Sequence, residues 1–211
     1  MYLENEINGK LESLREKFVD KSIDFKNVKS WLEECLKKYK VKMNVEEDIE
    51  LEDCFRINAF FGEDPEGHEI EIVLVKNPDN HFLYIPTNEN FDTFSFYISQ
   101  ALQHELIHRH QFFMREFDTI ELPQKYRSKA TDSKIRKAQE YLGAADEIDA
   151  RANDLFLEIK RAGKNINCLT SLENIVKDCD TLSGYIAVFH DSNHHVIKRL
   201  LKKAFLYAAA A

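Results

Sequence analysis

The chain of 211 residues lacks the features of several common protein classes. It has no apolar run of eighteen or more residues, which a membrane-spanning helix needs. Its first six residues, MYLENE, are acidic where a signal peptide would be basic. Its four cysteines show no CxxC spacing, so they predict reduced, mostly buried thiols rather than disulfides or zinc ligands. We therefore expect no membrane association and a cytoplasmic protein.

The chain also has fewer basic than acidic residues. The chain carries 29 Lys and Arg against 37 Asp and Glu, a formal net charge of −8, which argues against a nucleic-acid groove. A basic cluster at residues 198–203 is typical of a solvated helix face. An acidic stretch at residues 46–53 lacks the spacing and the Gly of an EF-hand, so it predicts a solvated edge or loop rather than a calcium site.

No Pro/Gly/Ser-rich linker and no internal repeat interrupts the chain, and 44% of its residues are hydrophobic. A chain of this length can bury one sizeable core, which predicts one domain with an appended segment. We expect residues 1–164 to form the domain, with a helical N-terminal lead-in, and residues 165–207 to form a helical C-terminal segment. The four alanines at 208–211 resemble an expression scar or a placeholder run.

The most informative stretch is HELIH at residues 104–108, which has the form HExxH. On a helix that advances about 100° per residue, His104 and His108 fall about 40° apart and one turn apart along the axis, so both imidazoles can reach one metal ion. Glu105 lies about 60° from His108 and could act on a water molecule without ligating the metal. This arrangement is typical of a catalytic zinc site. The alternative is that both histidines only form hydrogen bonds within a core.

The same stretch can be predicted as a helix without reference to the motif. Residues 94–113 contain no Gly or Pro, and Asp92 or Thr93 could serve as the N-cap. Both histidines belong to one stripe at helical spacing, and an apolar stripe adjoins it. The first stripe is Tyr97, Ala101, His104, His108 and Phe112, and the second is Leu102, Leu106 and Phe113. We therefore expect the histidines at the edge of a buried face.

A catalytic zinc usually takes three protein ligands, so a third ligand must follow downstream. The pattern HExxHxxGxxH is excluded, because Gln111 and Met114 stand where it needs Gly and His. A second helix is expected to begin just after Gly143, with Glu147 in its acidic first turn, 39 residues after His108.

Glu147 is therefore the predicted third ligand, with Asp149 and Glu140 as weaker candidates. An apolar face on the same helix would pack on the core and hold Glu147 toward the first helix; it consists of Ile148, Ala152, Leu155 and Ile159. The alternative is a solvent-facing Glu147 that pairs with Arg151 at i, i+4, a common surface arrangement.

With these residues the chain resembles gluzincin-type metallopeptidases, in which HExxH on one helix is completed by a Glu on a following helix. More narrowly, HELIH with Gln111, followed by EIDARA at 147–152, is similar to small metallopeptidases encoded in tailed-phage genomes. The resemblance covers about residues 68–160 and has specific motifs only at its two ends. It implies a zincin-like fold at residues 1–164, a zinc ion held by His104, His108 and Glu147, and Glu105 as general base.

The flanking segments predict an α+β fold around the motif. Residues 24–40 should form an amphipathic helix with one apolar face, made by Val28, Trp31, Leu32, Cys35 and Leu36. Residues 55–61 and 69–75 predict the strands of a hairpin that turns through Gly62, Pro65 and Gly67, and residues 81–86 predict a further short strand. We expect the strand at 70–75 to be exposed, as an edge for an extended peptide.

The C-terminal segment predicts helices around residues 171–180 and 194–207. Its histidines, His190, His194 and His195, are expected at the surface rather than in a second metal site, because neighbours on a helix diverge by about 100°. Three side chains could donate a hydrogen bond to an oxyanion in the cleft, and the sequence does not choose among them: Tyr141, Tyr185 and His190.

The resulting hypothesis is a zinc-dependent peptidase that hydrolyses peptide bonds with a metal-activated water and Glu105 as general base. Its partner would be a protein or peptide substrate, with no nucleic acid and no membrane. One alternative is a catalytically inactive structural or adaptor protein of a phage virion that keeps the zincin-like fold and belongs to the phage particle. A third hypothesis is an HExxH amidase or deformylase-like enzyme.

Overall fold

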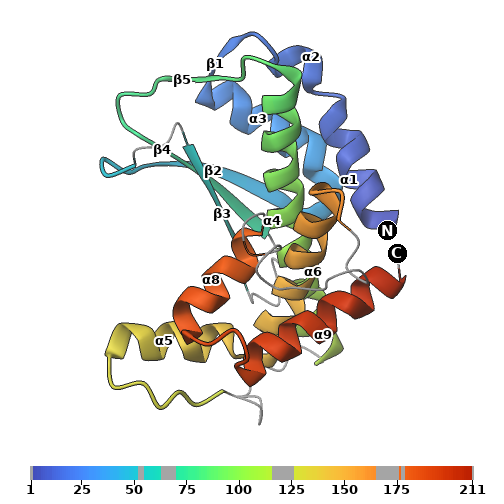
Figure 1. Cartoon of the computed structure of the whole chain (residues 1–211). Helices are drawn as coiled ribbons and strands as arrows, with labels where there is room; N and C mark the ends of the chain where they lie inside the picture. The colour runs from blue at the N-terminus through green and yellow to red at the C-terminus, as the bar shows by residue number, and fades with distance from the viewer. Residues whose placement is uncertain are drawn as a thin grey trace. The chain divides into compact units, whose positions relative to one another are not determined.

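The protein is described from a computed structural model. The structure describes residues 2–51, 55–62, 70–115, 126–164, 176 and 179–210. It divides into two compact units, residues 1–109 and 110–211, and the division falls within one continuous helix, α4 (Asn88–Met114). Helices predominate and strands occur only in the N-terminal unit among the described residues (Figure 1), so the predicted α+β class is confirmed.

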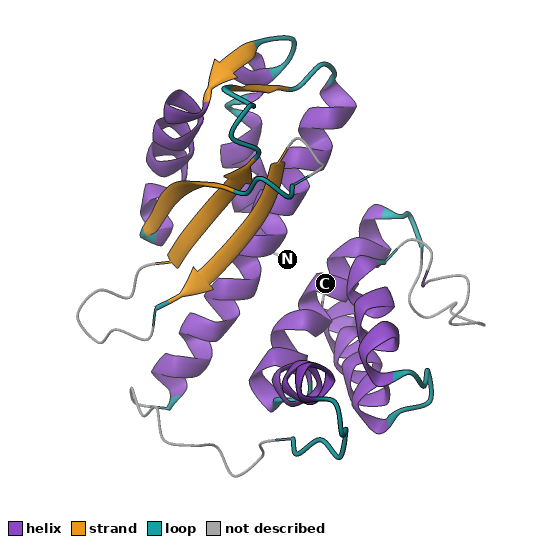
Figure 2. Ribbon diagram, turned by 90° about the vertical axis from the view of Figure 1, so that its left-hand side faces the viewer, coloured by secondary structure: helices purple, strands orange, loops and turns teal. Residues whose placement is uncertain are grey.

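The N-terminal unit contains a three-stranded sheet in the order β2-β4-β3. Figure 2 draws the strands in orange. Its strands are β2 (Val41–Glu47), β3 (Phe55–Phe61) and β4 (Ile70–Lys76). β3 and β4 are antiparallel, with Phe55 opposite Lys76, which confirms the predicted hairpin pairing. The turn through Pro65 and Gly67 lies outside the described residues.

The expectation that residues 70–75 form an exposed edge is wrong. β4 is the central strand, because β2 pairs with it in parallel on the side opposite β3. Side chains of β4 are buried on both faces. Ile70, Ile72 and Leu74 join the main core with the helices of this unit, whereas Val73 and Val75 pack with Leu51 on the other face. An extended peptide therefore cannot pair with β4.

Helices α1 (Tyr2–Glu12), α2 (Arg15–Phe18) and α3 (Phe25–Leu36) contribute to the main core of this unit. The predicted helix at 24–40 is confirmed as α3 followed by the short 3-10 helix η1 (Lys37–Tyr39). Asp24 caps α3 by accepting a hydrogen bond from the Lys26 N–H, 2.6 Å away. Val28, Leu32 and Leu36 are fully buried, as the apolar face predicts.

The predicted strand near residues 81–86 is β5 (Phe82–Tyr84), but it does not join the larger sheet. It pairs antiparallel with β1 (Ser22–Asp24). The Tyr84 hydroxyl donates to the Asp20 carboxylate, 3.0 Å away, and extends this contact.

Helix α4 begins earlier than expected, and neither predicted cap is used. The Asn90 N–H donates to Oγ1 of Thr87, 3.2 Å away, so Thr87 takes the capping position. Asp92 instead forms an ion pair with Arg15 at 2.5 Å, and the Thr93 hydroxyl donates to the carbonyl of the preceding turn. The additional turn is stabilised because it buries Phe91, which contacts Phe18 edge-on.

The C-terminal unit contains helices α5 (Ser133–Leu142), α6 (Ala145–Arg161), α8 (Asp180–Phe189) and α9 (His195–Ala210). The predicted apolar face of α6 is confirmed, since its four residues pack with α8 and α9 in one core. The helices on both sides of Gly163 therefore share that core. The expected helix at 171–180 lies mostly outside the described residues, and α9 matches the helix expected at 194–207.

Within the described part of the chain, no helix combines the length and the apolar character that a bilayer span requires. Cys35 and Cys179 are free thiols, as predicted; Cys35 is half-buried and Cys179 is buried. Cys54 and Cys168 lie outside the described residues.

Candidate metal centre

The two histidines of the HExxH motif face the same side of α4, near its C-terminal end. Their Nε2 atoms lie 3.1 Å apart and their ring centroids 4.8 Å apart. His104 is buried and His108 is half-buried. The expected position at the edge of a buried face is thus confirmed, and one turn of helix brings both nitrogens to one point.

Glu147 lies in the first turn of α6, where Gly143 and Ala144 determine the start of the helix. A Cβ atom on Gly143 would overlap the ring of Tyr126, so only Gly allows this close approach. Ala144 has extended backbone angles (φ −62°, ψ 142°) and takes the N-cap position. The carboxylates of Asp146 and Glu147 then stand at the positive end of the helix dipole.

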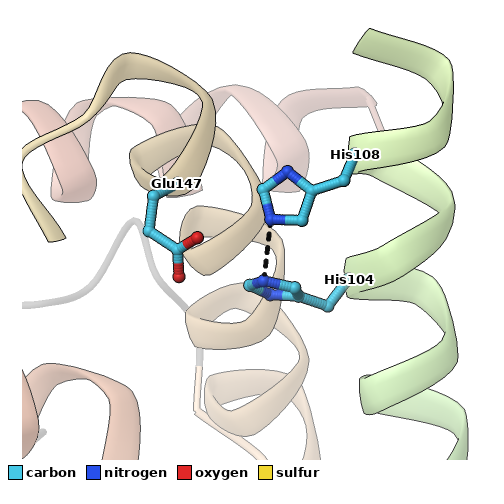
Figure 3. Close-up of side chains that lie close together, drawn as sticks. All are labelled: His104, His108 and Glu147. Carbon is cyan, nitrogen blue, oxygen red and sulfur yellow. Dashed lines mark hydrogen bonds between the residues drawn. The ribbon is translucent and has the colours of Figure 1, made fainter. Parts of the chain in front are cut away.

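The three predicted ligands come together (Figure 3). One donor atom from each of His104, His108 and Glu147 lies within 4.8 Å of the other two. Glu147 is only 4% exposed. Two imidazoles and one carboxylate, partly removed from water, form a set that could hold a metal ion.

The separation of the two imidazole nitrogens fits a small divalent ion. Zinc binds imidazole nitrogen at about 2.0–2.1 Å with tetrahedral angles, which places two such nitrogens about 3.3 Å apart. The observed separation of 3.1 Å between Nε2 of His104 and Nε2 of His108 is close to that value. A set of two His and one Glu also leaves one tetrahedral position for water or substrate, as in catalytic sites.

Within the C-terminal unit, side chains from the end of α4 contact the first turn of α6. The Gln111 side-chain amide donates to the backbone carbonyl of Asp146, 3.2 Å away. Arg115, directly after α4, forms an ion pair with the Asp146 carboxylate. Gln111 lies one turn after His108, and Asp146 directly precedes Glu147. The two contacts to Asp146 therefore restrain the backbone that carries the predicted third ligand.

The ion pair between Glu147 and Arg151 is also present. Arg151 Nε lies 2.8 Å from Glu147 Oε1. Because Glu147 is buried rather than facing solvent, this contact is not the surface pair of the alternative interpretation. Asp154, 4% exposed at its side chain, lies 3.4 Å from Arg151 Nη1 and adds a second carboxylate.

The weaker ligand candidates lie elsewhere. Asp149 pairs with Lys203 of α9 at 2.9 Å, and Glu140 is exposed on α5. Neither belongs to the His104, His108 and Glu147 group.

The structure separates the three candidates for an oxyanion donor. The Tyr185 hydroxyl donates to the Leu142 carbonyl, 2.9 Å away, and burial raises its pKa, so it already has a structural role. Tyr141 lies at the end of α5, where desolvation and the neighbouring Glu147 carboxylate raise its pKa to about 12. His190 is exposed at the end of α8 with a left-handed backbone (φ 55°).

The other C-terminal histidines pack beside aromatic rings. His194 stacks on Phe189 with ring centroids 4.6 Å apart, and both His194 and His195 contact Tyr126. Desolvation lowers the pKa of His194. Among the residues that the structure describes, His190, His194 and His195 belong to no group that could hold a metal ion.

Sequence reasoning missed the polar residues around Glu147. The sequence predicts Arg151 only as the surface partner of Glu147 in the alternative interpretation, and it predicts no role for Asp154 or Asp146. A signal was available, because Glu147, Arg151 and Asp154 are spaced by four and three residues and so share one face of α6.

No protein-family model, curated protein or solved structure matches the chain. The resemblance to gluzincins therefore depends on HELIH at 104–108 and EIDARA at 147–152 alone. The family, the peptidase activity and the identity of the metal stay predictions.

Proposed function

We propose that this chain is a zinc-dependent peptidase of the gluzincin type with a zincin-like fold. His104, His108 and Glu147 would hold the zinc, and a protein or peptide would be the substrate. The observation that carries the proposal is the convergence of an HExxH pair with a buried Glu from a separate helix, 39 residues later. A surface ion pair or a purely structural pair of histidines would not require this convergence.

The chain's own residues supply the remaining parts of a hydrolytic site. A zinc ion held there would supply Lewis acidity toward a water molecule and a substrate carbonyl oxygen. Glu105 is 7% exposed and follows His104 directly. As the general base, its carboxylate would accept a proton from that water and return it to the leaving amine. Tyr141, in the last turn of α5, is the oxyanion donor that we favour, because the Tyr185 hydroxyl already donates to the Leu142 carbonyl.

The test combines metal analysis with a catalytic variant. Protein purified without chelator should contain close to one zinc per chain by elemental analysis, and His104→Ala should lose it. Mass spectrometry should detect cleavage of a mixture of denatured proteins. Glu105→Gln should keep the zinc and lose about a hundredfold to ten-thousandfold in cleavage rate, the usual contribution of a general base.

Three outcomes would count against the proposal. If the wild-type protein binds no metal, every enzymatic form of the proposal is excluded. Equal cleavage rates in the wild type and Glu105→Gln would show that the assigned base is wrong. Metal binding without cleavage of any peptide would favour the structural or adaptor role instead.

A further inference from the structure

A charged row lies along one face of α6, all within the C-terminal unit. Glu147, Arg151 and Asp154 follow each other at spacings of four and three residues. Arg151 Nε lies 2.8 Å from Glu147 Oε1, and Arg151 Nη1 lies 3.4 Å from Asp154 Oδ2. Both carboxylate side chains are 4% exposed, whereas the Arg151 side chain is 36% exposed.

This row is more than a stabilising ion pair. A buried carboxylate is costly unless it is paired and hydrogen-bonded, and Arg151 serves two of them. A guanidinium presents donors in a rigid planar fork, so it determines the direction of each carboxylate as well as its charge balance. The shorter contact is with Glu147, the predicted metal ligand.

We propose that Arg151 is a positioning residue that orients the Glu147 carboxylate for metal binding, and that Asp154 holds Arg151 in place. This inference rests on the proposed metal centre. Arg151 itself would not touch the metal. Its hydrogen bond engages Oε1 of Glu147 and favours ligation of the metal through a single carboxylate oxygen.

Two physical effects of Arg151 have opposite signs, which makes the proposal testable. If Arg151 competes with the metal for Glu147, or repels the cation, its removal would strengthen metal binding. If it orients the carboxylate, its removal would weaken binding, because Glu147 would have to lose rotamer freedom when the metal binds. Because Asp154 offsets the positive charge of Arg151, we expect the orientation of Glu147 to outweigh the repulsion between Arg151 and the metal ion. Partners of metal ligands typically contribute a factor of about 10–100 in metal affinity.

The experiment measures zinc affinity by competition with a chromophoric chelator in the full-length protein. The variant is Arg151→Met, which keeps an apolar stem and removes both contacts. The matched control is Lys203→Met. It removes the ion pair of Lys203, on α9, with Asp149, which lies on α6 as Arg151 does. We expect about a 10–100-fold loss of affinity in Arg151→Met and no change in the control. Arg151→Lys should be intermediate, because an ammonium lacks the planar fork.

Two further measurements separate positioning from a general loss of structure. The visible absorption spectrum of the Co²⁺-loaded protein should change in Arg151→Met and stay unchanged in Lys203→Met. Circular dichroism of the metal-free proteins should be the same for the wild type and both variants. If Arg151→Met does not fold, the zinc affinities of Arg151→Lys and Asp154→Asn test whether Arg151 positions Glu147. Both affinities should then be lower than that of the wild type.

Failure of this inference differs from failure of the proposed function. If the wild type binds no zinc, the metal centre is wrong and the inference falls with it. If the wild type binds zinc and Arg151→Met binds it equally or more tightly, Arg151 is not a positioning residue, while the metal centre stands.

Discussion

The side-chain amide of Gln111 donates a hydrogen bond to the backbone carbonyl of Asp146, 3.2 Å away. This contact joins the last turn of α4 to the residue that directly precedes Glu147. A polar residue three positions after His108 therefore restrains the backbone of the predicted third ligand, although it is not itself a ligand.

Replacement of Gln111 by Leu should weaken zinc retention without abolishing it. The variant loses one hydrogen bond to the first turn of α6, and residues that orient metal ligands typically contribute a factor of about 10–100 in affinity. Equilibrium dialysis against zinc would measure the change. His110→Ala is the control, because His110 is exposed on the same turn. A variant that retains zinc as well as the control does would show that the Gln111 contact has no influence on the site.

Glu147→Gln should lower the zinc content at neutral pH, because an amide is a weaker ligand than a carboxylate for a divalent ion. Asp149→Asn removes a carboxylate from the same turn of α6, but Asp149 pairs with Lys203 and should not matter. Elemental analysis after gel filtration would compare the two. Equal zinc content in the wild type and Glu147→Gln would refute the assignment of the third ligand.

Gly143→Ala should destabilise the protein, because the added Cβ would overlap the Tyr126 ring. Overpacking of this kind costs about 1–3 kcal/mol. Gly184→Ala is an opposite control, since no atom lies within 4 Å of the new Cβ and Gly184 is inside helix α8. That substitution should stabilise the helix by about 0.5–1 kcal/mol. Urea unfolding followed by circular dichroism would measure both, and a neutral Gly143→Ala would contradict the close packing.

Acid stability should depend in part on Glu12. The hydrogen bond from Arg15 lowers the pKa of Glu12 below its ordinary value of 4.5. A carboxyl group with a lowered pKa in the folded state contributes stability above its unfolded pKa, and the contribution is lost as the pH falls through the folded pKa. Glu12→Gln should therefore reduce the free energy of unfolding at pH 7 more than at pH 3. The effect should be small and salt-sensitive, because Glu12 is largely exposed.

Thermal unfolding at several pH values would test this expectation. Glu16→Gln is the control, because Glu16 is also exposed and lies in the same part of the chain. An identical pH dependence in the wild type and Glu12→Gln would show that the Arg15 contact does not contribute to acid stability.

Local periodicity was sufficient to predict the two helices that carry the candidate site. The spacing of His104 and His108 placed both imidazoles on one face of a helix, and the Gly143 signal placed Glu147 in the first turn of the next. The structure contains both helices, and one donor atom from each of the three side chains lies within 4.8 Å of the other two. These features follow from the sequence because helical geometry relates neighbours within a few residues of each other.

Pairing between distant segments was decided only in the folded chain. Strand β2 has an alternating pattern, with Val41 and Met43 buried and Lys42 exposed, yet its place beside β4 depends on residues about thirty positions away. For that reason β4 became a central strand rather than an exposed edge. The start of α4 was decided in the same way, because burial of Phe91 against Phe18 favours the Thr87 cap over the later candidates.

For Arg151, too, the sequence determines one part of the role and the folded chain determines the other. In the sequence, Glu147 and Arg151 at i, i+4 also fit an ordinary surface pair, which is the alternative to Glu147 as a metal ligand. The sequence determined which residues share a face of α6, whereas tertiary packing determined that the face carrying Glu147 and Asp154 is buried. Burial changes the energetics of a carboxylate through the environment around it, and that environment exists only after folding.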